Sequence, residues 1–299
     1  MASSRVQSPP MAVAAPPVHS VSLWRNAWRR LLKNKLAVAG GGAVLALTLV
    51  ALGADLIAPY HYTAVNFGRN YEFPSWEFPL GTDHLGRDML SRLIYGARVS
   101  IFVGFVAESI VLLIGVPLGA LAGYYGGKVD MGIMRVVDVM YAFPRLLFVL
   151  LLMSMLGRGL LNIFIAIGLT GWVRVARLTR AQMLTLKERE FCEAARAAGA
   201  GHLGIILRHL LPNALTPIIV SLTFGIPEAI FTEAALSFIG VGITPPTPSW
   251  GQMVGESQQF IRSYWHLCVF PAVGIATIML AFTFLGDGLR DALDPKLNQ

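Results

Sequence analysis

Five ionisable side chains interrupt the long apolar runs of this chain, and they are the first candidates for chemistry. An ionised side chain in the middle of a membrane-spanning helix costs roughly 2.5–3.5 kcal/mol on insertion scales, so its presence there indicates a function or a partner. One interpretation places these residues on the path of a charged solute. The other gives them structural ion pairs, a partner subunit or a water-filled vestibule. The five are Glu108, Asp138, Arg145, Glu228 and Glu233.

Within this set, Asp138 and Arg145 are spaced for one face of a single helix. They would lie two turns apart on it, which is too far for a direct ion pair.

The familiar patterns of catalytic and metal sites do not occur in the sequence. Gly127-Lys128 fails the phosphate-loop pattern, because position 122 is Ala and position 129 is Val. Two cysteines are too few for a four-cysteine zinc site or a disulfide scaffold. No run supplies the nucleophile and base, or the metal cluster, that a membrane-embedded hydrolase needs. We therefore predict no catalytic residue, no metal site and no cofactor bound by this chain.

Composition places the chain in a membrane. Of its 299 residues 14% are charged and 55% are hydrophobic, whereas soluble domains carry about 25% charged residues. The mean hydropathy is +0.61. A formal net charge of +7 would suit a nucleic-acid binder. The basic residues stand at the ends of apolar runs, however, which is the positive-inside pattern of membrane proteins. We predict an all-α polytopic membrane protein with no nucleic-acid partner.

Six apolar segments are long enough to cross a bilayer, for which about 20 residues are needed. They are Leu36–Ala58, Ser100–Gly123, Met131–Leu156, Gly159–Leu178, Ala214–Val241 and Leu267–Leu285. Glycines at positions 115, 119 and 123 indicate close helix packing on the second segment. Lys and Arg gather in residues 1–35 and 174–212, which places both regions, and with six crossings both termini, in the cytoplasm.

These segments divide the chain into five parts. Residues 1–22 are rich in Pro, Ser and Ala and are expected to be disordered. The other parts are a basic amphipathic helix with the first span (23–58), an extracytoplasmic segment (59–98), a five-helix core (99–290) and a cytoplasmic tail (291–299). The core contains a large cytoplasmic loop over residues 180–212.

This loop predicts a helical hairpin. In its first helix Phe191, Ala194, Ala195 and Ala198 form a narrow face of mostly small residues, and Gly199 suits the left-handed position that closes a helix. In the second, Leu203, Ile206, Leu207 and Leu210 form an apolar stripe that Pro212 is expected to interrupt. From the residues alone, a docking element for another protein and a solvated amphipathic loop are equally good interpretations.

The same loop resembles the EAA loop of permease subunits in binding-protein-dependent ABC importers. In that family the loop forms a coupling helix that sits in a groove of the ATPase subunit. The residues that match the family pattern are Glu193, Ala194, Ala195, Gly199 and Pro212.

Further motifs resemble the C-type permease of dipeptide and oligopeptide importers. They are Pro79–Asp88, Gly96–Ser100, Glu233–Gly242, Pro248–Gly251 and Gly288–Pro295. The first motif contains Asp83, Arg87 and Asp88, for which a contact with the binding protein and a local stabilising network are both open. Trp250 is expected as an anchor at the membrane interface.

The resemblance implies the fold of a type I ABC importer permease and a set of partners. These are a second, B-type permease in a heterodimer, two cytoplasmic ATPases that bind ATP and Mg²⁺, and an extracytoplasmic substrate-binding protein. For such a permease, Glu108, Glu228 and Glu233 become candidates for the translocation path, where the charged amino terminus of a peptide would pass, and structural pairing stays the other interpretation of each. Relatives of this kind also import glutathione, nickel chelates or oligosaccharides, so the cargo stays open at this stage.

One alternative belongs to another class. An ion-coupled secondary transporter would use Glu108, Glu228 and Glu233 as a carboxylate relay. Such a protein is often built from inverted repeats, which this sequence does not show, and it gives no reason for the cytoplasmic hairpin.

Overall fold

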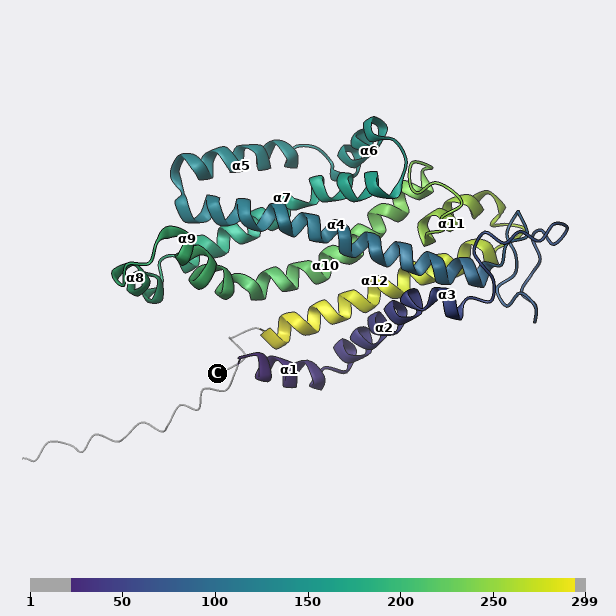
Figure 1. Ribbon diagram of the computed structural model, residues 1–299, viewed down its shortest axis with the longest axis horizontal. Helices are drawn as coiled ribbons and strands as arrows, with labels where there is room; N and C mark the ends of the chain where they lie inside the picture. Colours follow the sequence, from purple (N-terminus) through teal and green to yellow (C-terminus); the bar gives the residue numbers. More distant parts are fainter. Residues whose placement is uncertain (1–22, 294–299) are drawn as a thin grey trace, which may run out of the picture.

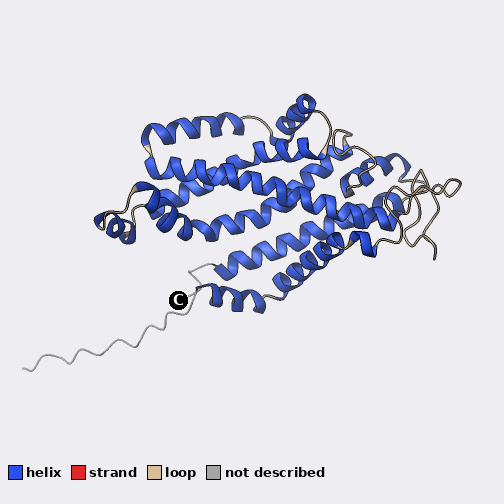
Figure 2. Cartoon of the chain, viewed as in Figure 1, coloured by secondary structure: helices blue, strands red, loops and turns tan. Residues whose placement is uncertain are grey.

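The computed structural model describes residues 23–293, and within that range the chain is helical, with no β-strand (Figures 1 and 2). The expected all-α class is confirmed. The predicted disordered tail, residues 1–22, and positions 294–299 of the predicted C-terminal tail lie outside the described residues. In chain order the elements are α1 (Leu23–Lys33), α2 (Lys35–Leu52), α3 (Ala54–Ile57), α4 (Met89–Tyr125), α5 (Gly127–Tyr141), α6 (Arg145–Leu156), α7 (Leu160–Leu186), α8 (Glu190–Ala197), α9 (His202–Gly204), the π-helical turn η1 (Ile205–Leu210), α10 (Leu211–Phe238), α11 (Trp250–Ser257), the 3-10 turn η2 (Gln258–Phe260) and α12 (His266–Leu293).

Five helical stretches in the described range are long and apolar enough to cross a membrane: α2, α4, α7, α9–α10 and α12. The predicted span Met131–Leu156 is wrong as a single helix. It is divided into α5 and α6, which are bent by 89° relative to each other. Counted together, this pair would make a sixth span.

The break has a local cause in Pro144. A residue that precedes proline avoids the helical region, so the helix ends before it. The N–H of Ala142 closes α5 on the carbonyl oxygens of Asp138 and Val139. Pro144 then precedes α6 as its N-cap without a capping side chain, and the first backbone bond back to it comes from Phe148.

Helix α4 begins at Met89 rather than at Ser100, and a side chain caps its first turn there. Asp88 is the N-cap, and its Oδ2 accepts from the N–H of Ser91 at 2.7 Å and from its hydroxyl at 2.6 Å. The predicted extracytoplasmic segment 59–98 therefore contains the start of this helix.

Helices α4 and α7 pack closely along the glycines of α4, as predicted. A Cβ on Gly115 would lie 2.7 Å from the carbonyl oxygen of Trp172, and one on Gly123 would lie 2.6 Å from that of Arg180. Gly119 would overlap the backbone of Ala176 in the same way. Only glycine lets the two backbones approach this far.

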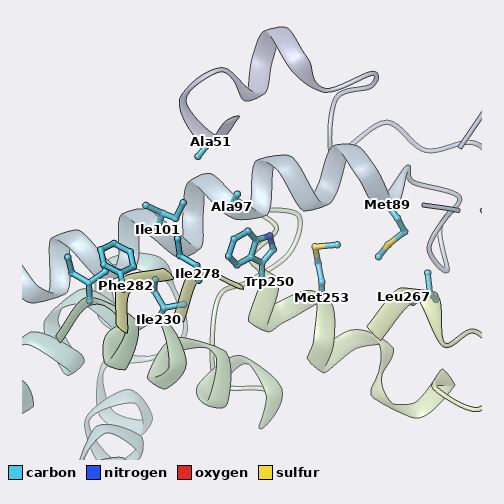
Figure 3. Close-up of a cluster of buried hydrophobic side chains, with 11 residues drawn as sticks. Ala51, Met89, Ala97, Ile101, Ile230, Trp250, Met253, Leu267, Ile278 and Phe282 are labelled. Carbon is cyan, nitrogen blue, oxygen red and sulfur yellow. The ribbon is translucent and has the colours of Figure 1, made fainter. Parts of the chain in front are cut away.

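The remaining spans form the rest of the bundle. Helix α10 lies between the α4–α7 pair and α12, and α2 runs along α12 (Figure 1). Figure 3 shows the core that joins them around Trp250. The indole is 2% exposed and its Nε1 donates to the carbonyl oxygen of Leu93 at 2.9 Å. The expectation that Trp250 is an interfacial anchor is therefore wrong: it is a core residue with a satisfied polar end.

Candidate functional site

A cleft of about 240 Å³ opens where the break between α5 and α6 meets α7 and α10. Met140, Tyr141, Phe143 and Phe148 give it an apolar and aromatic lining. Three charged side chains share the lining: Arg145, Arg174 and Glu228.

These three and the buried Glu108 form a chain of alternating charges, which we call the charge cluster. Glu228 pairs with Nη1 of Arg145 and lies 3.8 Å from Nε of Arg174. Arg174 in turn reaches Oε1 of Glu108 at 3.2 Å through Nη2. Two guanidinium groups thus face two carboxylates, so the cluster is neutral when all four are ionised. Four helices, α4, α6, α7 and α10, supply one member each.

Small residues make room for these long side chains. A Cβ on Gly171 would lie 3.2 Å from Nη2 of Arg145, and a Cβ on Gly225 would overlap the carboxylate of Glu108. Arg174 is fixed further by Ser221, whose Oγ accepts from Nη1 at 2.8 Å and whose carbonyl oxygen accepts at 3.2 Å.

The sequence alone predicts only part of this cluster. Glu108 and Glu228 were expected on one path, and the structure brings them together through Arg174. Arg174 was missed, because it stands where the apolar core of its predicted span ends. Arg145 was a candidate without a partner, and α10 supplies that partner, Glu228.

Glu233 lies apart from the charge cluster. It is fully buried, and its Oε1 accepts from the hydroxyls of Ser237 and Ser249, each at 2.7 Å. Ser249 is also the N-cap of α11 and accepts from the N–H of Gln252. Glu233 therefore ties α10 to the start of α11.

A second charged group lies before and within the start of α4. Asp83 accepts from Arg87 Nε at 2.6 Å and from Arg92 Nη1 at 2.5 Å. Arg92 also binds Glu256 on α11 at 2.9 Å. Asp83 and Arg87 are 3% and 4% exposed, and Asp88, the α4 N-cap, is 2% exposed. All three sequence candidates therefore lie inside the segment, where they join it to α4 and α11.

The protonation of Asp83 follows from this environment. Burial raises the pKa of its carboxyl group, but the guanidinium groups of Arg92 and Arg87 outweigh burial, and the pKa lies below its ordinary value. Backbone N–H groups of Arg87 and Leu85 add to the lowering.

The loop after α7 forms the predicted first helix, α8. Cys192 is fully buried in a cluster with Met183, Ile205 and Leu210, and it anchors α8 to the bundle. Glu193 and Ala194 are exposed. Gly199 has φ +83°, as predicted from its closing position, and the N–H of the next residue, Ala200, returns to Ala195 O at 3.0 Å.

The second half of the hairpin differs from the prediction. Residues 205–210 form a π-helical turn, and α10 continues through Pro212 instead of stopping there. Because π turns bring residues five apart together, Ile205 joins Leu210 on the buried side, while Leu203 and Leu207 are exposed. Pro212 sits at the second position of α10, directly after the π-helical turn.

Two contacts fasten this hairpin to the end of α4. The hydroxyl of Tyr124 and Nδ1 of His202 share a hydrogen bond of 2.8 Å. Lys187 Nζ donates to the carbonyl oxygen of Gly123 at 3.1 Å.

Comparison with known proteins adds relatives to this geometry. A family model described as "Binding-protein-dependent transport system inner membrane component" matches residues 115–299. A second, "N-terminal TM domain of oligopeptide transport permease C", matches residues 22–74.

Individual proteins are similar over nearly the whole chain. The dipeptide transport system permease protein DppC of Bacillus subtilis is 45% identical over 94% of this chain and 88% of its own length. The glutathione transport system permease protein GsiD of Pectobacterium atrosepticum is 41% identical over 92% and 91%. Among solved structures, the MetNI methionine ABC transporter in an inward-facing conformation matches with a TM-score of 0.57 and 21% identity, over 69% of this chain and 98% of that one. That likeness supports the predicted permease fold.

Proposed function

Because the chain belongs to the family of binding-protein-dependent transport system inner membrane components, we propose that it forms half of the translocation pathway for di- and oligopeptides in an ATP-driven importer. The observation that carries the choice of cargo is the charge cluster. A peptide has a positive and a negative end, and the cleft presents two arginines and one glutamate beside an aromatic lining. Glu108 and Glu228 belong to this proposed path.

The proposed assembly has four kinds of component. This chain pairs with a second, B-type permease. Two ATPases bind ATP and Mg²⁺ on the cytoplasmic side, and a binding protein delivers peptide from the other side. The chain itself makes and breaks no covalent bond.

We propose that the helical hairpin of α8, α9 and η1, which we call the α8 hairpin, couples this chain to the ATPases. Glu193 and Ala194 face outward while Cys192 anchors the helix, so a partner can press on a surface of small residues. Ala195, Gly199 and Pro212 complete the proposed coupling set. Motion of α8 would reach α4 through the contacts of Tyr124 and Lys187.

The family and the apolar helices make this a multi-pass protein of the inner membrane. We propose in addition that the N- and C-termini and the α8 hairpin are cytoplasmic, and that the segment before α4 is extracytoplasmic. The charge distribution supports this orientation, since Lys and Arg concentrate in residues 1–35 and 174–212.

Transport by the reconstituted complex tests the cargo. The permease, its co-purifying subunits and the neighbouring binding protein are placed in proteoliposomes. Uptake of labelled dipeptide, oligopeptide, glutathione, a nickel chelate and an oligosaccharide is measured with ATP and without it. We expect ATP-dependent uptake of the two peptides. Preferential uptake of glutathione, a nickel chelate or an oligosaccharide would contradict the peptide cargo but leave the proposed importer assembly unchanged.

The partners are tested by purification from the native membrane. We expect a second permease and the ATPases to be recovered with the wild-type chain, and fewer ATPases with Glu193→Lys. Recovery of the chain alone, with transport driven by an ion gradient and no ATP, would contradict the importer and favour a carboxylate relay.

A further inference from the structure

Arg145 lines the cleft, and its guanidinium group is incompletely hydrogen-bonded. Its side chain is 31% exposed. Nη1 pairs with Glu228, while Nε is buried and has no hydrogen-bond partner within the part of the chain described. A guanidinium group presents its N–H donors in a fixed fork that matches the two oxygens of a carboxylate. Arg145 therefore has an N–H donor that its present pair does not use, and this donor becomes accessible to a ligand when the guanidinium group turns out of its present position.

Glu228, by contrast, has a second cation within reach. Its Oε2 lies 3.8 Å from Nε of Arg174, which is held in place by Ser221 and Glu108. If Arg145 turns away, Glu228 keeps a positive neighbour and is not left as an uncompensated charge. The cluster can therefore exchange one partner without the large penalty of an isolated charge among apolar groups.

The cleft has the size for one end of a cargo molecule. Its volume of about 240 Å³ is below the range of roughly 300–1,000 Å³ that is usual for pockets enclosing a whole ligand. Tyr141, Phe143 and Phe148 stand beside Arg145 and offer apolar contact to an adjoining side chain.

From these contacts we propose that Arg145 binds the C-terminal carboxylate of the peptide in transit, and that the Glu228 carboxylate pairs with Arg174 instead of Arg145 while the peptide is bound. The inference rests on the proposed peptide cargo. Its chemical content is narrower, because it assigns one terminus of the peptide to one side chain. A purely structural Arg145–Glu228 pair would make no distinction between a free and a blocked carboxyl end.

The test compares a dipeptide with its C-amidated form in proteoliposomes that contain the complete transporter. Each peptide is supplied at a concentration that saturates the binding protein. The amount of peptide transported per ATP hydrolysed then depends on the permease and not on the affinity of the binding protein. For the wild type we expect the free acid to be transported at least tenfold better than the amide. For Arg145→Gln we expect the ratio of free-acid to amide transport to fall to about one, because the free acid is then transported no better than the amide.

Two further variants complete the design. Arg158→Gln changes an exposed arginine beyond the other end of α6 in the same way, and it should keep the wild-type ratio. Arg145→Lys retains the positive charge but not the fork, and it should lower the ratio severalfold. If the Arg145→Gln transporter does not assemble, the ratio measured with Arg145→Lys serves as the test of the proposal.

A wild-type ratio near one would overturn the proposal, and so would an unchanged ratio in Arg145→Gln, or in Arg145→Lys where that variant decides. These outcomes leave the proposed function intact, since peptide would still be imported. Absence of ATP-dependent uptake of either peptide by the wild type would instead remove the proposed function, and this inference with it.

Discussion

The carboxylate of Glu108 lies so close to Gly225 that a Cβ on residue 225 would overlap both carboxylate oxygens. Glycine at this place lets α10 approach α4 with a carboxylate between them. It also holds Glu108 at 3.2 Å from Arg174, the residue that links Glu108 to Glu228. The geometry of the charge cluster thus depends on the absence of one methyl group.

Gly225→Ala should therefore disrupt the charge cluster. The added methyl group displaces the Glu108 carboxylate from Arg174 and leaves a buried charge poorly compensated, which costs about 3–5 kcal/mol when one partner is lost outright. We expect the midpoint of thermal unfolding of the purified subunit to drop by several degrees, together with a loss of uptake. Gly42→Ala is the matched control, since it also lies in a helix and meets nothing within 4 Å. An unchanged midpoint in Gly225→Ala would contradict the packing described.

Gly199 should tolerate asparagine better than valine. At φ +83° a β-branched residue is strained by about 1–2 kcal/mol, whereas Asn enters this region more readily. We expect Gly199→Val to raise the number of ATP molecules hydrolysed per peptide transported, and Gly199→Asn to do so less.

The control for this pair is Gly201→Ala in the same loop. Gly201 has φ −68° and open space around its Cα, so alanine should leave coupling unchanged. Equal coupling in the valine and asparagine variants would show that the left-handed turn has no part in coupling.

Asp83→Asn should destabilise the segment before α4. The change removes a charge that two buried arginines share, and leaves Arg87 and Arg92 with Glu256 alone. We expect a loss of about 3 kcal/mol or more in the free energy of unfolding, measured by thermal denaturation. Asp55→Asn serves as the control. Its pair with Arg98 is exposed, with 67% of the Asp55 side chain accessible, and should contribute little.

The contribution of Asp83 should also depend on pH in a defined direction. Because its pKa is lowered on folding, the stabilisation is fully present above the ordinary value of about 3.9 and is lost as the pH falls through the folded pKa. The difference in unfolding temperature between wild type and Asp83→Asn should be constant from about pH 5 to 8 and shrink below about pH 4. A difference that changes already between pH 6 and 7 would contradict this assignment.

Glu233→Gln should leave transport within about twofold of wild type, because Glu233 binds two hydroxyls and is not among the residues that line the cleft. A glutamine oxygen can accept the same two hydrogen bonds. Glu233→Ala should destabilise the protein by about 1–3 kcal/mol, since Ser237 and Ser249 lose their acceptor. Strong loss of uptake in a stable Glu233→Gln protein would return this residue to the translocation path.

The spans and the hairpin were predictable from sequence for the same reason: both depend on local patterns. Apolar length marks α2, α4 and α12, and the alanines followed by Gly199 mark α8. The break at Pro144 was missed because the apolar run continues across it, so hydropathy alone cannot separate a kinked pair from one span. Likewise, the π turn before Pro212 changes which residues share a face without changing composition.

The partners of charged residues could not be predicted, because they depend on which helices meet. Glu108 and Arg174 are brought together by the glycine contacts between α4 and α7, and Glu228 arrives from α10. Trp250 illustrates the same limit. Its place after Pro248-Ser249 resembles an interfacial position, but Ser100 and Leu93 bind its two N–H groups inside the core.

The break between α5 and α6 also bears on how the subunit is made. The N–H groups of Arg145, Leu146 and Leu147 open α6 without a capping side chain, and a helix leaves its first N–H groups without partners of its own. Hydrocarbon offers them no hydrogen bonds, so this stretch must face protein or water rather than lipid. If the proposed second permease covers this stretch, a copy synthesised without it would hold an unsolvated backbone in the bilayer. We expect such orphan copies to be recognised and degraded, which would match the amounts of the two proposed permeases in the cell.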